Sequence, residues 1–102
     1  YIMTERLMQK EDLKRKIVYS ESLGSSRLIY RAFETSLELD GKTIVNYGVE
    51  VESRIADRQI ETIENFSDKI DIVAEFMELI IRNAVLPISL YDTAIDFLSM
   101  DL

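Results

Sequence analysis

Alternating hydrophobic and polar residues run through the first two thirds of the chain and predict β-strands. The alternation around Tyr19 indicates a strand near residues 16–22. Longer alternating runs cover about 27–38 and about 43–53, and a short run covers 59–63. Short turn segments rich in Gly, Ser and Asp separate these runs. Consecutive strands joined in this way form an antiparallel meander of three to four strands.

The pair Asp40-Gly41 fits two hairpin geometries, and they give the sheet different faces. A two-residue loop would set Phe33 opposite Gly48, on a face rich in charged residues. A three-residue loop with a bulge, and with Gly41 at positive φ, would set Phe33 opposite Tyr47. Only the second geometry separates an apolar face from a polar one. We therefore predict the bulged turn.

After the last strand the apolar residues recur with the period of a helix. Ser67 has the side chain of an N-cap, Asp68 suits the positive end of a helix, and Asn83 and Pro87 are typical of a helix end. The predicted inner face of this helix consists of Ile70, Val73, Ala74, Met77, Ile80, Ile81 and Ala84.

A second helix is predicted after Pro87. The sequence from Ser89 to Asp92 has the S-x-x-D form of a capping box. The predicted inner stripe of this helix consists of Leu90, Ala94, Phe97 and Leu98.

These elements predict one α+β domain over residues 16–102, with an antiparallel meander packed on one face by two C-terminal helices. Residues 1–15 are predicted to form an N-terminal arm or a short helix, because Met3, Leu7 and Met8 would share a helical face.

The apolar arc of the first helix is wider than contact with one small sheet requires. Such excess apolar surface marks a site for a protein partner or for self-association as a homodimer. The alternative is that both helices and the N-terminal arm bury one another. The predicted partner surface consists of Phe76, Leu79, Ile80, Tyr91 and Ile95.

Two residue types that dominate catalytic and metal chemistry are missing from the sequence. The chain contains no histidine and no cysteine. Their absence removes Ser-His-Asp triads, thiolate nucleophiles and the usual ligands of structural zinc. The three glycines stand far apart and form no phosphate-binding loop. We predict no cofactor.

Carboxylates offer the remaining routes to chemistry. Asp92 and Asp96 lie four residues apart and could hold Mg²⁺, but capping and solvent exposure explain them better. Glu34, Glu50 and Glu52 could supply a pair of the kind used by glycosidases, but a small open sheet offers no cleft. We therefore predict no catalytic residue, no metal ligand and no enzymatic activity.

The chain is acidic, with a formal net charge of −7. Residues 28–102 carry six Lys/Arg and fifteen Asp/Glu, so this part of the surface repels phosphate backbones. A stacking platform of Tyr19, Tyr30 and Tyr47 lacks basic neighbours apart from Arg31. The charge thus disfavours nucleic-acid binding. It suggests, as an alternative function, an acidic mimic of nucleic acid that inhibits a basic partner protein.

Four short stretches resemble a small uncharacterised family of Bacillota, a domain of unknown function. They are LDGKTIVNYGVEV (39–51), IENFSDK (63–69), LPISLYD (86–92) and IDFL (95–98). In that family a histidine commonly follows the Pro-Ile pair, and Ser89 stands there in this chain. If the family has a histidine-dependent activity, this member would lack it. The resemblance implies the α+β fold and a cytoplasmic location, and no known reaction, cofactor or partner.

Taken together, the sequence predicts a non-enzymatic protein-interaction or regulatory module of a bacterial cytoplasm. Charged residues interrupt every apolar run, so no membrane segment is expected.

Overall fold

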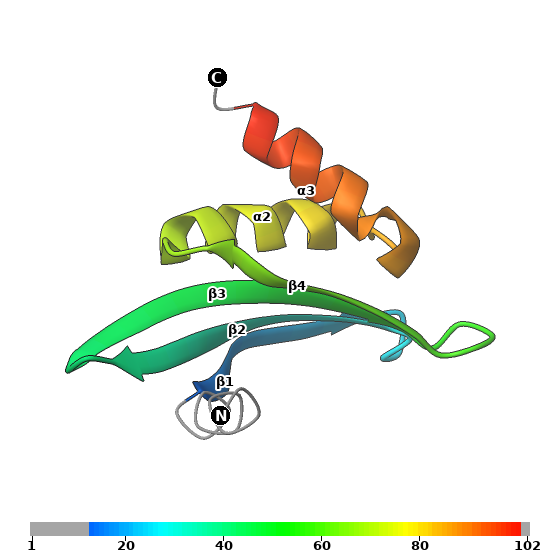
Figure 1. Cartoon of the computed structure of the whole chain (residues 1–102). Coiled ribbons are helices and arrows are strands. Elements are labelled where there is room, and N and C mark those ends of the chain that lie inside the picture. Colours follow the sequence, from blue (N-terminus) through cyan, green and yellow to red (C-terminus); the bar gives the residue numbers. More distant parts are fainter. Residues whose placement is uncertain (1–12, 101–102) are drawn as a thin grey trace.

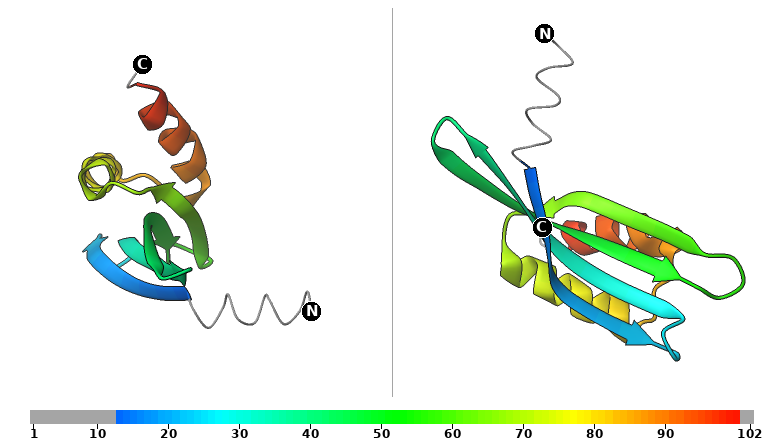
Figure 2. Two further views of the ribbon diagram at one scale, coloured as in Figure 1. Left: turned by 60° about the vertical axis from the view of Figure 1, so that its left-hand side comes forward. Right: turned by 90° about the horizontal axis from the view of Figure 1, so that it is seen from below.

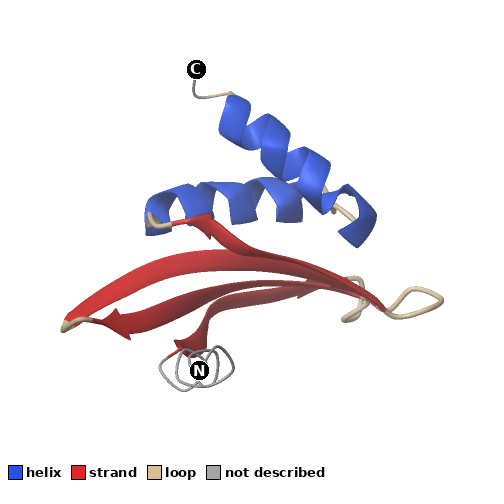
Figure 3. Cartoon of the chain, in the orientation of Figure 1, coloured by secondary structure: helices blue, strands red, loops and turns tan. Residues whose placement is uncertain are grey.

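The computed structural model describes residues 13–100 and contains a four-stranded sheet with a layer of helices on one side (Figure 1). The strands are β1 (Leu13–Leu23), β2 (Leu28–Leu39), β3 (Lys42–Ser53) and β4 (Gln59–Ser67). They pair in chain order, and every pair is antiparallel. The helices that follow are α2 (Ile70–Arg82), the 3₁₀ turn η1 (Pro87–Ser89) and α3 (Leu90–Ser99). The predicted α+β class, with its meander and two C-terminal helices, is confirmed (Figure 3).

The outer strands are longer than predicted. β1 begins at Leu13, so residues 13–15, which were assigned to the N-terminal arm, belong to the sheet. The rest of that predicted arm lies outside the described residues. β4 continues to Ser67 and so includes the residue that was predicted to cap the first helix.

The β2–β3 hairpin has the two-residue loop, and the prediction of a bulged turn is wrong. Leu39 pairs with Lys42, and Phe33 lies opposite Gly48 rather than Tyr47. Asp40 and Gly41 have φ angles of 54° and 75°. Positive φ at both loop positions is the geometry of a type I′ turn, whose twist matches that of the flanking strands. The local fit of Asp-Gly to this turn therefore outweighs the apparent mixing of polar and apolar residues on one face.

In the observed register, the apolar side chains on the two faces of the sheet are buried in different ways. Opposite residues on antiparallel strands point to the same side, so Tyr30 with Val51 and Ala32 with Val49 face the helices. Figure 2 shows this face beneath the helical layer and the opposite, outer face without it. The side chains of the sheet itself therefore have to cover whatever is apolar on the outer face.

The core lies between the sheet and α2, and α3 adds to it from one end. Phe66 of β4 stacks on Phe76 of α2 with ring centroids 4.5 Å apart, and Phe97 of α3 lies 5.2 Å from Phe76. These three rings join the sheet, α2 and α3. The buried cluster consists of Leu28, Tyr30, Ala32, Val49, Val51, Phe66, Val73, Phe76, Met77, Ile80, Leu90 and Ala94.

The inner faces of both helices differ in part from those predicted. Ile70, Ala74 and Ala84, which were assigned to the buried side of α2, are exposed, whereas Phe76 is buried. Leu98, which was assigned to the inner stripe of α3, is exposed as well. Phe76 is buried because α2 faces Phe66 and Phe97 as well as the sheet.

Neither predicted cap forms. The N-cap of α2 is Lys69, and Ser67 instead accepts a hydrogen bond from the backbone N–H of Lys69 at 3.1 Å. Ser89 is the N-cap of α3 but makes no side-chain cap bond, since its φ and ψ are already helical. The preceding 3₁₀ turn explains this, because it continues directly into α3 and leaves no extended N-cap residue.

The end of α2 is held to the sheet. The backbone N–H of Val85 donates to the carbonyl of Ile80 at 3.0 Å, and Ala84 has a φ of 48°. This is the hydrogen-bond pattern of a Schellman motif, with alanine where glycine is usual. The hydroxyl of the buried Tyr30 donates to the carbonyl of Val85 at 2.9 Å. The turn after α2 is therefore fixed over β2.

On the outer face, the Phe33 ring fills the space above Gly48. A Cβ at position 48 would lie 2.6 Å from the carbonyl oxygen of Ile63 and closer still to the Phe33 ring. The guanidinium of Arg15 covers the ring from the solvent side, 3.7 Å from its centroid. Phe33 is thus fully buried on a face that has no helix.

A charged cluster around Glu52 covers the rest of the outer face near the β3–β4 end. The side chain of Glu52 is fully buried and accepts hydrogen bonds from Arg31, Arg54 and Arg58 at 2.7, 2.9 and 2.8 Å. Arg31 also binds Glu50 at 2.9 Å. Hydrogen bonds from the three arginines, led by Arg58, lower the pKa of Glu52 to about 2. The cluster explains why charged residues occupy this face.

Gly48→Ala is expected to lower the free energy of unfolding by about 2–3 kcal/mol, because the new methyl group overpacks the space of the Phe33 ring. Gly41→Ala is the matched control. It places a methyl group where no atom lies within 4 Å but keeps an unfavourable positive φ, so it should cost only about 1 kcal/mol. Urea denaturation measures both values. An equal cost at the two positions would contradict the proposed packing.

Glu52→Gln is expected to destabilise the protein at pH 7 by an amount that disappears in acid. The pKa of Glu52 falls from 4.5 to about 2 on folding, so its ionised form stabilises the fold above pH 4.5, and this contribution is lost as the pH falls towards 2. Unfolding curves of the two proteins should therefore converge between pH 4.5 and pH 2. Glu64→Gln, at a side chain that is 63% exposed, serves as the control and should change little at any pH.

Candidate functional site

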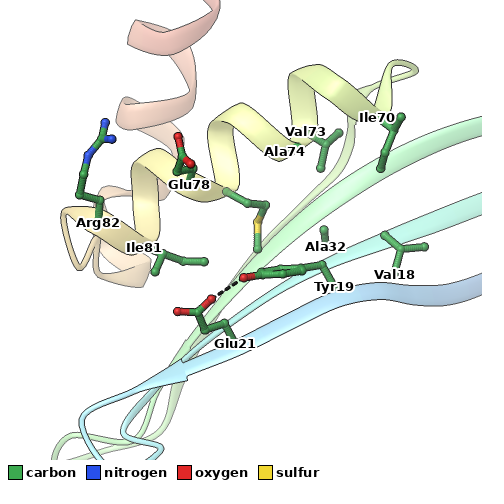
Figure 4. A pocket seen from close by; sticks show the side chains of 11 residues that line it. Val18, Tyr19, Glu21, Ala32, Ile70, Val73, Ala74, Glu78, Ile81 and Arg82 are labelled. Carbon is green, nitrogen blue, oxygen red and sulfur yellow. Dashed lines mark hydrogen bonds between the residues drawn. The ribbon is translucent and has the colours of Figure 1, made fainter.

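A groove with a volume of about 550 Å³ lies between β1 and α2 (Figure 4). This volume falls in the range of sites that bind small ligands. We call it the β1–α2 groove. The residues that line it are Val18, Tyr19, Glu21, Ala32, Ile70, Val73, Ala74, Met77, Glu78, Ile81 and Arg82.

The groove exists because the sheet extends beyond the helix that covers it. β1 is an edge strand, and α2 packs mainly on β2, β3 and β4. The side of α2 that faces β1 therefore keeps apolar residues without a covering strand. Ile70 on this side is 50% exposed.

A bulge in β1 supplies the floor of the groove. The register of β1 against β2 shifts between Ile17 and Tyr19, so Val18 is an extra residue. Such an extra residue re-aims the side chains beside it. Val18 and Tyr19, although consecutive, both line the groove, and Figure 4 shows them on the side of the strand that faces α2. Tyr19 is 45% exposed, so its ring is available to a bound group.

The two ends of the groove differ in polarity. Val18 and Ile70 lie towards one end, and Glu21, Glu78 and Arg82 lie towards the other (Figure 4). The hydroxyl of Tyr19 donates a hydrogen bond to the carboxylate of Glu21, and this bond raises the pKa of Tyr19. Two carboxylates against one guanidinium leave this end negative. The groove therefore suits an apolar group that carries a positive charge at one end.

The predicted partner surface is divided between the core and the exterior. Phe76 and Ile80 are fully buried, so they belong to the core, and Leu79 is partly buried. Tyr91 and Ile95 of α3 are 50% and 60% exposed. The wide apolar arc of α2 is thus used mainly inside the molecule.

Sequence reasoning missed the groove. Its residues come from two elements far apart in the chain, and the pattern of α2 does not show which strand the helix leaves uncovered. The one local signal is the uninterrupted apolar run from Ile17 to Tyr19, which breaks the alternation where the bulge lies.

The carboxylates considered for chemistry do not converge. Asp92 and Asp96 are exposed on α3, and the described residues 13–100 contain no group of three potential metal-ligating side chains. Glu34 pairs with Tyr47 on the helix side of the sheet, whereas Glu50 and Glu52 lie on the outer face with their arginines. Glu34 therefore lies on the opposite side of the sheet from Glu50 and Glu52.

The three tyrosines considered as a stacking platform have different surroundings in the structure. Tyr30 is buried, Tyr19 lines the groove, and the Tyr47 hydroxyl lies 3.4 Å from Glu34, to which it donates. All three point to the helix side, so they present no open aromatic surface on the sheet.

Among the described helices, none is long and apolar enough to cross a membrane.

Comparison with known families identifies the chain. The model of a family of unknown function, DUF6514, matches residues 6–100, and the protein belongs to this family. Searches of curated proteins and of solved structures gave no match.

Proposed function

We propose that the protein is a non-enzymatic interaction module that binds a segment of a partner protein in the β1–α2 groove. The observation that carries this proposal is the apolar lining of the groove beside an edge strand, in which Val18, Tyr19 and Ile70 are 37%, 45% and 50% exposed. Contiguous exposed apolar surface of this kind is typical of a binding site.

The chemistry of the groove specifies the bound segment. Its apolar part would contact Val18 and Ile70, and its positive charge would lie near Glu21 and Glu78. A segment with an apolar side chain close to a Lys or Arg has this character. The non-enzymatic part of the proposal is supported by the full sequence, which has neither histidine nor cysteine to act as a base or nucleophile.

Ala74→Trp is expected to block the groove, because Ala74 lines it and is exposed. A photo-reactive amino acid at position 70, at the rim of the groove, would capture the bound segment in the native cell. Mass spectrometry of the adduct should identify an apolar segment with a Lys or Arg. We expect Ala74→Trp to lower the yield of this adduct about tenfold, as for loss of a binding hot spot.

Glu75→Trp is the matched control for this experiment. Glu75 is the neighbouring exposed residue of α2 and does not line the groove. This variant should retain the adduct. Equal adduct yield in both variants, or an acidic segment in the adduct, would refute the proposal.

A second candidate function is an acidic mimic that inhibits a basic, nucleic-acid-binding partner. The observation that favours it is the charge of the helical layer. α2 and α3 carry the carboxylates Asp71, Glu75, Glu78, Asp92 and Asp96, against Arg82 alone. Arg31 of the sheet and Arg54 and Arg58 of the β3–β4 loop, in contrast, form ion pairs with Glu50 and Glu52.

This second function predicts binding that depends strongly on salt. Because exposed charges are screened at high ionic strength, the affinity for the partner should fall at least tenfold between 0.05 and 0.5 M NaCl. Competition by duplex DNA for the same partner, measured by fluorescence anisotropy, gives an independent readout. An affinity that is unchanged by salt, or binding that DNA does not compete with, would refute the acidic-mimic function. The groove-based function would then be the remaining proposal.

A further inference from the structure

The outer side of α3 exposes a second apolar surface, distinct from the groove. Ile88 in the 3₁₀ turn η1 and Tyr91, Ile95 and Leu98 in α3 are spaced by three, four and three residues, and are 83%, 50%, 60% and 46% exposed. This spacing is the a/d repeat of a coiled coil. We call these four residues the α3 seam. From it we infer a second binding site, which takes an amphipathic helix of a partner protein with Lys or Arg beside its apolar stripe.

The seam is separate from the side of α3 that stabilises the fold. Leu90 and Ala94 are buried, and Phe97 packs on Phe66 and Phe76. α3 extends away from the sheet (Figure 1), and Ile95 and Leu98 stay 60% and 46% exposed, whereas Tyr91 in its first turn reaches Thr62 of β4. The helix therefore has two apolar sides, and the core needs only one of them.

Charge beside the seam defines the partner. Asp92 follows Tyr91 and occupies the position that is called e in a heptad, and Asp96 lies one turn further along the same flank. Residues at e and g positions form the interhelical ion pairs that determine partner choice. The other flank of the seam is occupied by the packed side of α3, so these aspartates supply the charge that a docked helix would meet. A basic flank on the partner is complementary to them.

The same charges disfavour a second copy of the chain as the occupant. When two identical helices pair antiparallel about a twofold axis, each e position lies beside the e position of the other helix. Asp92, at the e position, would then face Asp92 of the other copy, which is destabilising. A Lys- or Arg-bearing helix has no such conflict.

Tyr91 gives the seam an ordered aromatic anchor. Its hydroxyl donates to the carbonyl of Thr62 on β4 at 3.4 Å, while half of the side chain stays exposed. Tyrosines held in this way lose little entropy on binding and are common hot spots of interfaces. The seam is also independent of the groove, because the two share no residue.

Two synthetic peptides test the inference with the intact chain. Each is a 21-residue helix with Leu at a and d positions, and the e and g positions are Lys in one peptide and Glu in the other. Fluorescence anisotropy should show the Lys peptide binding at least tenfold more tightly than the Glu peptide. Ile95→Asp and Tyr91→Ala should each lower the affinity for the Lys peptide about tenfold.

Matched variants separate the seam from general attraction to an acidic protein. Ile44→Asp introduces the same charge at a residue of similar exposure on the β2–β3 hairpin and should leave binding unchanged. Asp92→Asn with Asp96→Asn should remove most of the preference for Lys, whereas Glu38→Gln with Asp57→Asn, which removes the same net charge elsewhere, should not. Ala74→Trp should not change the affinity for the Lys peptide. The proposal for the seam and the proposal for the groove can therefore be refuted separately.

Three results would overturn the inference. The first is equal binding of both peptides, or no binding of either. The second is unchanged affinity in Ile95→Asp, with unfolding curves showing that the variant is folded. The third is a dimer in light scattering that Ile95→Asp converts to a monomer, because the seam would then be occupied by a second copy.

Discussion

The contact between the Phe33 ring and Gly48 is the constraint on which the rest of the structure depends. It buries an aromatic side chain on a face that has no helix, and it tolerates only glycine on the facing strand. The contact requires the two-residue turn at Asp40 and Gly41, because a shift of one residue would move every side chain of β3 to the other face. Phe33 and the Glu52 cluster are buried on the outer face without a helix, although Ile17 and Ile44 on the same face stay 57% and 50% exposed.

Because the helices cover only one face of the sheet, parts of their own surface remain free for binding. α2 is centred on the inner strands, so its flank towards β1 remains open as the β1–α2 groove. α3 uses one side to complete the aromatic cluster and leaves the α3 seam exposed on the other. The charges follow the same division, since arginines of the sheet and of the β3–β4 loop pair with Glu50 and Glu52, while α2 and α3 carry five carboxylates against one arginine. Both proposed sites therefore favour basic partners, and a module with two such sites could hold two segments at once.

Local patterns predicted the elements and the class of fold well. Alternation marked the four strands, and the 3.6-residue period marked both helices, because burial of one side of an element leaves a repeat in the chain itself. The same patterns failed for the hairpin register. The charged residues on the Phe33 face argued against the two-residue loop, but in the fold Arg31 and Glu50 on that face form an ion pair within a larger cluster. Of the predicted partner surface, only Tyr91 and Ile95 are well exposed, because the wide arc of α2 is shared among the sheet, Phe66 and Phe97.

The sequence by itself determined that this chain forms a meander with two helices, and that histidine and thiol chemistry are absent from it. These properties depend on residue types and on spacings within single elements. Only the tertiary structure decided which face each strand presents, how far α2 reaches across the sheet and which side of α3 remains open. Those features depend on contacts between residues that are distant in the chain, such as Tyr30 with Val85 and Phe97 with Phe66, which leave no repeat in the sequence.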